Sequence, residues 1–144
     1  MIIIGSDHGG YQMKEAVKLF LKEEGIEFDD VGTYSDESCD YPDIAKNVAL
    51  KVAKSGQKGI LICGSGIGMS ISANKVNGVR CALCHDAYTA EYARRHNDAN
   101  IIAFGGRTTG LEIAKQMVKI FLSTDFDGGR HKRRIDKIAS MEGL

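Results

Sequence analysis

The chain has 144 residues with 19 basic and 19 acidic side chains, so it carries no formal net charge at pH 7. Its length predicts a single domain over residues 1–144 with room for a hydrophobic core. The neutral balance argues against a nucleic-acid partner, because such proteins generally carry an excess of basic residues. No apolar run approaches the ~20 residues of a membrane span, and the N-terminus lacks the pattern of a signal peptide. We therefore expect a cytoplasmic protein, without a membrane partner, whose four cysteines are reduced thiols.

Short apolar runs alternate along the chain with segments of helical periodicity. Buried parallel strands are short, apolar and rich in β-branched residues, which describes residues 2–4, 60–63, 79–84 and 101–104. The more polar segment 26–31 predicts a strand nearer an edge. Amphipathic stripes predict helices over about 13–21, 44–52, 67–76, 87–96, 113–121 and 130–141. One such stripe comprises Ile113, Ala114, Met117, Val118 and Phe121. The alternation predicts an α/β fold: a single-domain Rossmann-like three-layer sandwich with a five-stranded parallel sheet and a C-terminal helix.

Functional side chains gather where the predicted strands end. In a parallel α/β sheet, ligands bind at the carboxyl ends of the strands. Asp7 and His8 follow the first strand, Cys63 ends the third, and Arg107 follows the fifth. The sequence therefore predicts a functional site that brings an acid, a histidine, a thiol and an arginine to one edge of the sheet.

A glycine-rich turn follows Cys63 at the expected start of a helix, with glycines at positions 64, 66 and 68. Glycines leave backbone N–H groups uncovered, and such a turn binds the oxygens of a phosphate or of a developing enolate. Cys63 faces the same helix terminus, which favours its thiolate form. We predict a catalytic Cys63; the alternative is a small buried strand residue.

Three other motifs have weaker support. Cys81, Cys84 and His85 match the pattern of covalent haem attachment, but residues three apart in a strand face opposite sides of a sheet, which also argues against a zinc pair. The glycine turn resembles a dinucleotide fingerprint whose third glycine comes one residue early, so a non-catalytic nucleotide- or sugar-phosphate-binding module stays open as a second class of function. Asp7 next to His8 argues against a hydrolase triad, because adjacent residues cannot easily orient each other.

The densest basic cluster lies near the C-terminus, at residues 130–134. Arg130 and Arg134 are four residues apart, so both guanidinium groups project from one helix face. Such a pair suits the binding of a phosphate monoester. The alternatives are a solvated basic face and a nucleic-acid contact, which the neutral overall charge weakens.

Across nearly its whole length the chain resembles the B-type ribose-5-phosphate isomerases and the related galactose- and allose-phosphate isomerases. The resemblance rests on several ordered motifs at matching spacing: Ser6-Asp7-His8-Gly9-Gly10, Asp40-Tyr41-Pro42, Cys63-Gly64-Ser65-Gly66-Ile67-Gly68, Ala73-Asn74-Lys75, His96-Asn97-Asp98-Ala99-Asn100, Phe104-Gly105-Gly106-Arg107 and Gly128-Gly129-Arg130-His131 with Arg134.

This resemblance implies a reversible aldose–ketose isomerisation through an enediolate, with no metal and no cofactor. It implies ribose 5-phosphate as the substrate, ribulose 5-phosphate as the product, and a place in the pentose phosphate pathway. By position, Cys63 matches the proton-abstracting base, His96 the ring-opening acid, and Ser65 a hydroxyl that assists at the enediolate. Substrate binding is implied for a larger set: Asp7, His8, Gly64, Gly66, Ile67, Gly68, Asn97, Arg107, Arg130 and Arg134.

Three features of the sequence refine that expectation. Ser65 stands where the family often has threonine, which keeps the hydroxyl and loses a methyl group. Met69 stands where some members carry a glutamate base, so the chain matches the cysteine subtype. The pair His96 and Asn97, with the segment 128–131, favours ribose 5-phosphate over a 6-phosphohexose such as allose or galactose 6-phosphate, which remains the alternative.

The chain direction predicts an active site shared between two subunits. Cys63 ends a strand, whereas the helix expected over 87–96 runs back from that edge and carries His96 ~15 Å away. A two-fold partner would present its own His96 to Cys63, because an isologous interface repeats every contact. We therefore expect a homodimer with shared sites, or a tetramer built from such dimers.

Overall fold

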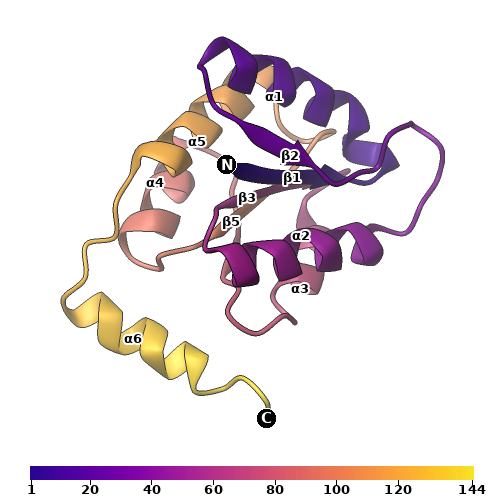
Figure 1. Cartoon of the computed structure of the whole chain (residues 1–144). Helices are drawn as coiled ribbons and strands as arrows, with labels where there is room; N and C mark the ends of the chain where they lie inside the picture. Colours follow the sequence, from indigo (N-terminus) through magenta and orange to yellow (C-terminus); the bar gives the residue numbers. More distant parts are fainter.

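Five parallel strands form one sheet, in the order β2-β1-β3-β5-β4. The structure is a computed structural model that describes all 144 residues (Figure 1). The strands are β1 (Ile2–Ser6), β2 (Phe28–Asp30), β3 (Gly59–Cys63), β4 (Cys81–Leu83) and β5 (Ile101–Gly105). The predicted α/β fold with a five-stranded parallel sheet is confirmed.

Helices cover both faces of the sheet (Figure 1). The helices are α1 (Tyr11–Glu23), α2 (Tyr41–Ser55), α3 (Ile67–Ala73), α4 (Ala87–Arg95), α5 (Leu111–Ser123) and α6 (Arg130–Ala139), with a 3₁₀ turn at His8–Gly10. Buried residues of α1, α4 and α5 share one apolar core, and those of α2 and α3 share the other. No helix combines the length and the apolar character that a membrane crossing requires.

Strand alternation explains why there are two cores. Successive side chains of a strand point to opposite faces, so Ile62 joins one core and Cys63 joins the other. Cys81 and Cys84 are divided in the same way, one in each core. The geometry thus agrees with the expectation that these two thiols do not converge on one haem or metal.

The two edge strands are shorter than the sequence predicts. β2 lies at one edge, as expected, and β4 lies at the other with only three residues. Regular pairing stops before β4, where the Arg80 amide donates to the side-chain oxygen Oδ1 of Asn100, at 2.8 Å, and not to a backbone carbonyl. In α5 the buried stripe consists of Ala114, Met117, Val118 and Phe121, whereas Ile113 is 43% exposed and was wrongly expected in the core.

The order of the strands places the ligand-binding crevice. β1 is followed by β2 on one side, and the chain then returns to add β3 on the other side of β1. Ligands bind outside the carboxyl ends of strands at such a switch point. Asp7 follows β1 and Cys63 ends β3, so both stand at this crevice.

Lys14 is fully buried, which its place outside the apolar stripe of α1 does not predict. Its Nζ donates to Asp30 Oδ1, at 2.7 Å, and to the backbone carbonyl of Thr33. Lys18 Nζ donates to the other Asp30 oxygen, at 2.8 Å. Burial alone would raise the pKa of Asp30, but hydrogen bonds from both lysines and from the Gly32 amide outweigh it and lower that pKa.

Replacing Lys14 by methionine should lower the free energy of unfolding by about 3 kcal/mol, because it removes one partner of a buried ion pair. The loss should shrink in acid. Because the pKa of Asp30 lies below its ordinary value of 3.8 in the folded protein, the contribution of the pair is present above that value. It disappears as the pH falls through the folded value. Urea unfolding at neutral and acidic pH measures both effects.

Lys51→Met is the matched control, since Lys51 pairs with Asp29 at 2.8 Å on the surface. An exposed pair of this kind contributes about 0–1 kcal/mol. Equal losses of stability in the two variants would contradict the role given to Lys14.

Candidate active site

The turn between β3 and α3 holds the sulfur of Cys63 against a backbone donor. Cys63 is 6% exposed, and its Sγ accepts a hydrogen bond from the Gly66 amide at 3.1 Å. Gly66 has a φ of 80°, and a Cβ there would stand 2.8 Å from the backbone of Phe104. Only glycine fits this position, and its amide donates directly to the sulfur.

Several backbone donors of the same turn are uncommitted. The amides of Gly64, Ser65 and Gly68 make no hydrogen bond within the chain, and Ser65 Oγ accepts one from the Ile67 amide at 3.3 Å. A Cβ at Gly68 would collide with the ring of Tyr41. The turn therefore presents free N–H groups beside Cys63, as the glycine pattern predicts.

Asp7 and His8 are oriented by the backbone after β1. Asp7 is 7% exposed, and its Oδ1 accepts a hydrogen bond from the Gly10 amide at 3.1 Å. His8 Nδ1 accepts one from the Cys39 amide at 3.2 Å. In the neutral ring the proton of His8 is therefore on Nε2, which makes Nε2 a donor.

The loop after β5 is tied to the loop after β3. The Gly106 amide donates to the Cys63 carbonyl at 2.8 Å, and the Arg107 amide donates to the Gly64 carbonyl at 3.1 Å. These bonds bring the Arg107 side chain over Gly64, where Nη1 would lie 3.3 Å from an added Cβ. Arg107 thus lines the same hollow as Cys63, although the two residues come from the ends of different strands.

Together these elements form a hollow of about 530 Å³, lined by Asp7, Tyr41, Cys63, Gly64, Ser65, Ile67, Gly68, Ile71, Arg107 and Thr108. Five of the predicted binding residues line this hollow, and a sixth, Gly66, belongs to the glycine turn beside it. The predicted catalytic residues Cys63 and Ser65 line it as well. Tyr41, Ile71 and Thr108 also line the hollow, but the sequence analysis did not predict them as site residues. The Asp40-Tyr41-Pro42 motif was a signal for Tyr41, but only the packing of α2 against the glycine turn brings its ring to the site.

His8 follows Asp7 but is not among the residues that line the hollow, and the other four predicted residues form a second group away from it. His96 caps the C-terminal end of α4, and the Asn97 carbonyl accepts a hydrogen bond from Arg80 Nε at 2.9 Å, next to the amino end of β4. Arg130 and Arg134 are exposed on α6, which buries only Ile135 and lies apart from the sheet (Figure 1). Within one chain, the candidate acid and the candidate base therefore occupy separate places.

His96 is accompanied by a second imidazole. The rings of His96 and His131 are stacked, with centroids 4.0 Å apart and an angle of 12° between their planes. Partial burial and the positive charges of His96, Arg130 and Arg134 lower the pKa of His131.

The environments of the cysteines differ. Burial raises the pKa of Cys81 to about 12 and that of Cys84 to about 11, so both are thiols at neutral pH. Cys63 alone receives a backbone N–H bond on its sulfur within a glycine turn. This hydrogen bond distinguishes Cys63 from Cys81, which begins β4, and from Cys84, which follows it.

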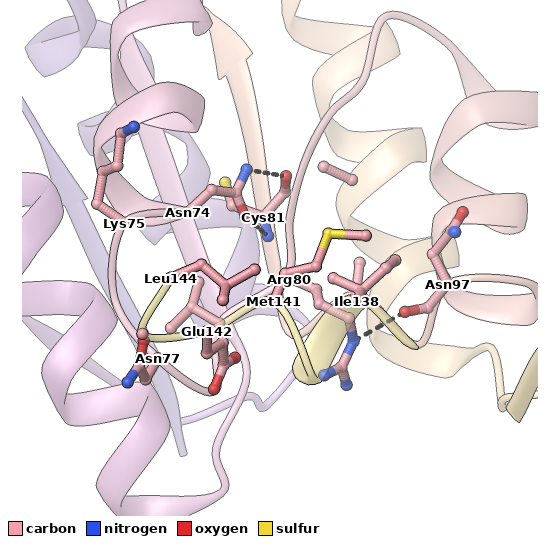
Figure 2. A pocket seen from close by; sticks show the side chains of 14 residues that line it. Asn74, Lys75, Asn77, Arg80, Cys81, Asn97, Ile138, Met141, Glu142 and Leu144 are labelled. Atoms are coloured by element: carbon pink, nitrogen blue, oxygen red, sulfur yellow. Dashed lines mark hydrogen bonds between the residues drawn. The ribbon is translucent and has the colours of Figure 1, made fainter. Parts of the chain in front are cut away.

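A larger hollow of about 590 Å³ lies elsewhere, between the C-terminal residues and the segment before β4 (Figure 2). Its lining includes Asn74, Arg80, Ile138, Met141 and Leu144. Asn74 is committed there to the backbone of Cys81 through two hydrogen bonds of 2.9 and 2.7 Å. This hollow includes neither Cys63 nor any residue of the glycine turn at the end of β3.

The chain is similar to known proteins along almost its whole length. Residues 2–138 match the family model described as Ribose/Galactose Isomerase. The ribose-5-phosphate isomerase B of Escherichia coli is 46% identical over 142 residues, covering 98% of this chain and 95% of that protein. The structure of ribose-5-phosphate isomerase B from Clostridium thermocellum matches with a TM-score of 0.94 and 50% identity, over 98% and 96% of the two chains.

A further solved structure holds a sugar phosphate. It is ribose-5-phosphate isomerase B from Mycoplasma genitalium with bound ribulose-5-phosphate, with a TM-score of 0.93 and 43% identity over 98% of this chain and 95% of that chain. Sequence and fold thus agree over the same span, glycine turn and β5 loop included. This chain belongs to the ribose/galactose isomerase family.

Proposed function

We propose that residues 1–144 act as one isomerase domain that interconverts ribose 5-phosphate and ribulose 5-phosphate through an enediolate, as a step of the pentose phosphate pathway. The observation that carries this proposal is the sulfur of Cys63, held by one amide beside three free amides in the hollow at the carboxyl edge. The names of the similar proteins support the same reaction. A cytoplasmic location stays a prediction from the sequence.

Cys63 supplies the base. Its thiolate takes the proton from C2 of the open aldose and returns it to C1, so the carbonyl moves from C1 to C2 while a proton passes between the two oxygens. A side chain that carries a proton both ways must have both forms accessible. The Gly66 amide on Sγ stabilises the thiolate, and protonation of the sulfur during the reaction needs no movement of that donor.

The glycine turn stabilises the intermediate. The free amides of Gly64, Ser65 and Gly68 can donate to the negative oxygens of the enediolate, together with the hydroxyl of Ser65. These donors are held by the chain before the substrate arrives, so little reorganisation is needed as charge develops. We assign the binding of sugar hydroxyls to Asp7, which lines the hollow, and to the Nε2–H of His8, the next residue.

The arginines recognise the phosphate. The ion pairs that arginines make within the chain involve only Arg80, Arg94 and Arg95. Arg107, Arg130 and Arg134 are exposed and are left for an external anion. A phosphate held far from the reacting carbons orients the sugar, and its binding energy lowers the barrier at C1 and C2.

Ring opening requires an acid that one chain does not bring to its own Cys63. We assign that role to His96 of a second copy of the chain, with Asn97, Arg130 and Arg134 beside it. Two isologous sites then form across one two-fold interface. The dimer is the smallest assembly that completes the site, and a tetramer of two such dimers would contain the same sites.

A hexose phosphate is the second candidate substrate, because the description of the family also includes galactose. Comparing turnover of ribose 5-phosphate with that of allose and galactose 6-phosphates distinguishes the two. We expect the pentose phosphate to be preferred.

Cys63→Ala should lower kcat by ~10²-fold or more, because no other side chain of the turn can carry the proton. Alkylation of the thiol should inactivate the enzyme, and substrate should protect against it. Cys84→Ala is the matched control: it removes a buried thiol from the opposite core and should leave kcat near that of the parent. A folded Cys63→Ala protein with near-normal turnover would rule out Cys63 as the base.

Arg130→Ala and Arg134→Ala should each raise KM for ribose 5-phosphate and leave little discrimination against unphosphorylated ribose. Formation of ribulose 5-phosphate is the measurement. Arg133→Ala, an exposed change on the same helix, is the control and should leave KM unaltered. Unchanged KM in both test variants would reduce this surface to a solvated basic face. Absence of product with the parent enzyme would favour the binding module instead.

Subunit mixing tests the shared site. Cys63→Ala and His96→Ala proteins, each nearly inactive alone, should regain activity when they are unfolded and refolded together. Each mixed dimer holds one site with both lesions and one with neither, so random pairing should restore roughly a quarter of the sites. A mixture that stays as inactive as its parents, while mass analysis shows mixed dimers, would contradict the shared site.

A further inference from the structure

Three side chains with metal-ligating atoms meet where α4 ends and α6 begins. They are His96, Asp127 and His131, and their ligand atoms all lie within 4.8 Å of one another. Both imidazoles are half-buried, whereas the carboxylate is exposed. The glycine turn, Cys63 and the hollow around them include none of these three residues.

The backbone holds this cluster in place. The Asp127 amide donates to the Arg95 carbonyl at 3.0 Å, which fixes the segment before α6 to the end of α4. Gly128 and Gly129 then turn the chain with φ of 71° and 58°, and the His131 amide donates to the Gly128 carbonyl at 3.1 Å. His131 is thereby folded back over His96, and each ring has a nitrogen within 4.8 Å of a carboxylate oxygen of Asp127.

We propose that His96, Asp127 and His131 bind one divalent transition-metal ion of the Zn²⁺ class. Two imidazoles and one carboxylate are typical ligands for zinc, cobalt and nickel, whereas calcium and magnesium prefer oxygen ligands throughout. With bonds of ~2.0–2.1 Å, tetrahedral ligands lie roughly 3.3 Å apart. Rotation of the half-buried His131 side chain and of the exposed Asp127 closes the remaining separation.

The surrounding charges limit the affinity of this site. Arg95 Nε contacts both carboxylate oxygens of Asp127, at 3.2 and 3.3 Å, so the ion competes with Arg95. Arg130 and Arg134 add positive charge nearby. A carboxylate offers about four lone-pair sites, so one guanidinium does not saturate it. We therefore expect a reversibly bound ion rather than a permanent structural one.

Metal binding would inhibit the isomerase, and this part of the inference rests on the proposed function. An acid must deliver a proton from an imidazole nitrogen to the ring oxygen of the sugar. A metal ion on His96 occupies a nitrogen lone pair and fixes the ring, so His96 can no longer cycle its proton. Zn²⁺ would thus inhibit ring opening by binding the acid His96, and not by binding the sulfur of Cys63.

Calorimetric titration of the full chain with Zn²⁺ tests the site directly. The Cys63→Ala protein is used, so that the reactive thiol cannot bind the ion. We expect one ion per chain, and a dissociation constant about tenfold or more weaker in Cys63→Ala proteins that also carry Asp127→Asn or His131→Asn. His85→Asn is the matched control, since His85 is an exposed histidine outside the cluster, and it should leave binding unchanged. Circular dichroism checks that each variant is folded.

Absence of Zn²⁺ binding, or equal affinity in the His131→Asn and His85→Asn proteins, would overturn the proposal. A second measurement uses proteins that retain Cys63 and compares, within each variant, the Zn²⁺ concentration that halves ribose 5-phosphate turnover. His131→Asn should require about tenfold more Zn²⁺ than His85→Asn. Equal sensitivity would overturn inhibition through His96. Metal binding in a parent protein without isomerase activity would refute the proposed function and leave the metal site standing.

Discussion

The close approach of two loops, one after β3 and one after β5, is the constraint on which the candidate site depends. A Cβ on Gly66 would stand 2.8 Å from the Phe104 backbone, and one on Gly105 would stand 2.7 Å from the Gly64 carbonyl oxygen. Because both positions lack side chains, the Gly106 amide reaches the Cys63 carbonyl at 2.8 Å. This contact orients Cys63 and the neighbouring free amides, and it sets Arg107 beside them.

Chain direction imposes a second constraint. In a parallel sheet, helices that leave the carboxyl edge end at the amino edge, so residues at the start and the end of α4 lie far apart. A base at the end of β3 and an acid at the end of α4 therefore cannot meet within one chain. The proposed association of two chains would bring the two together, since a two-fold axis completes two sites with a single interface.

The segments near the N-terminus and near the C-terminus are anchored to the rest of the fold in different ways. Near the N-terminus, buried Lys14 holds Asp30 and the Thr33 carbonyl, which anchors the loop that leads to Tyr41. Near the C-terminus, α6 is attached through a glycine turn and buries one residue, Ile135. The N-terminal side is thus firmly anchored beside the hollow, whereas the C-terminal helix is loosely attached and exposes Arg130 and Arg134.

Local patterns in the sequence were sufficient for the element order, the parallel sheet and the glycine turn at Cys63, because strand and helix periodicities and turn residues depend on near neighbours. Other features arise from contacts between segments remote in sequence. Tyr41 reaches the site only through packing of α2 on Gly68, and Lys14 is buried because Asp30 lies opposite it. The meeting of His96 with His131 and the short edge strand β4 likewise required the tertiary structure, since long-range hydrogen bonds and packing decide them.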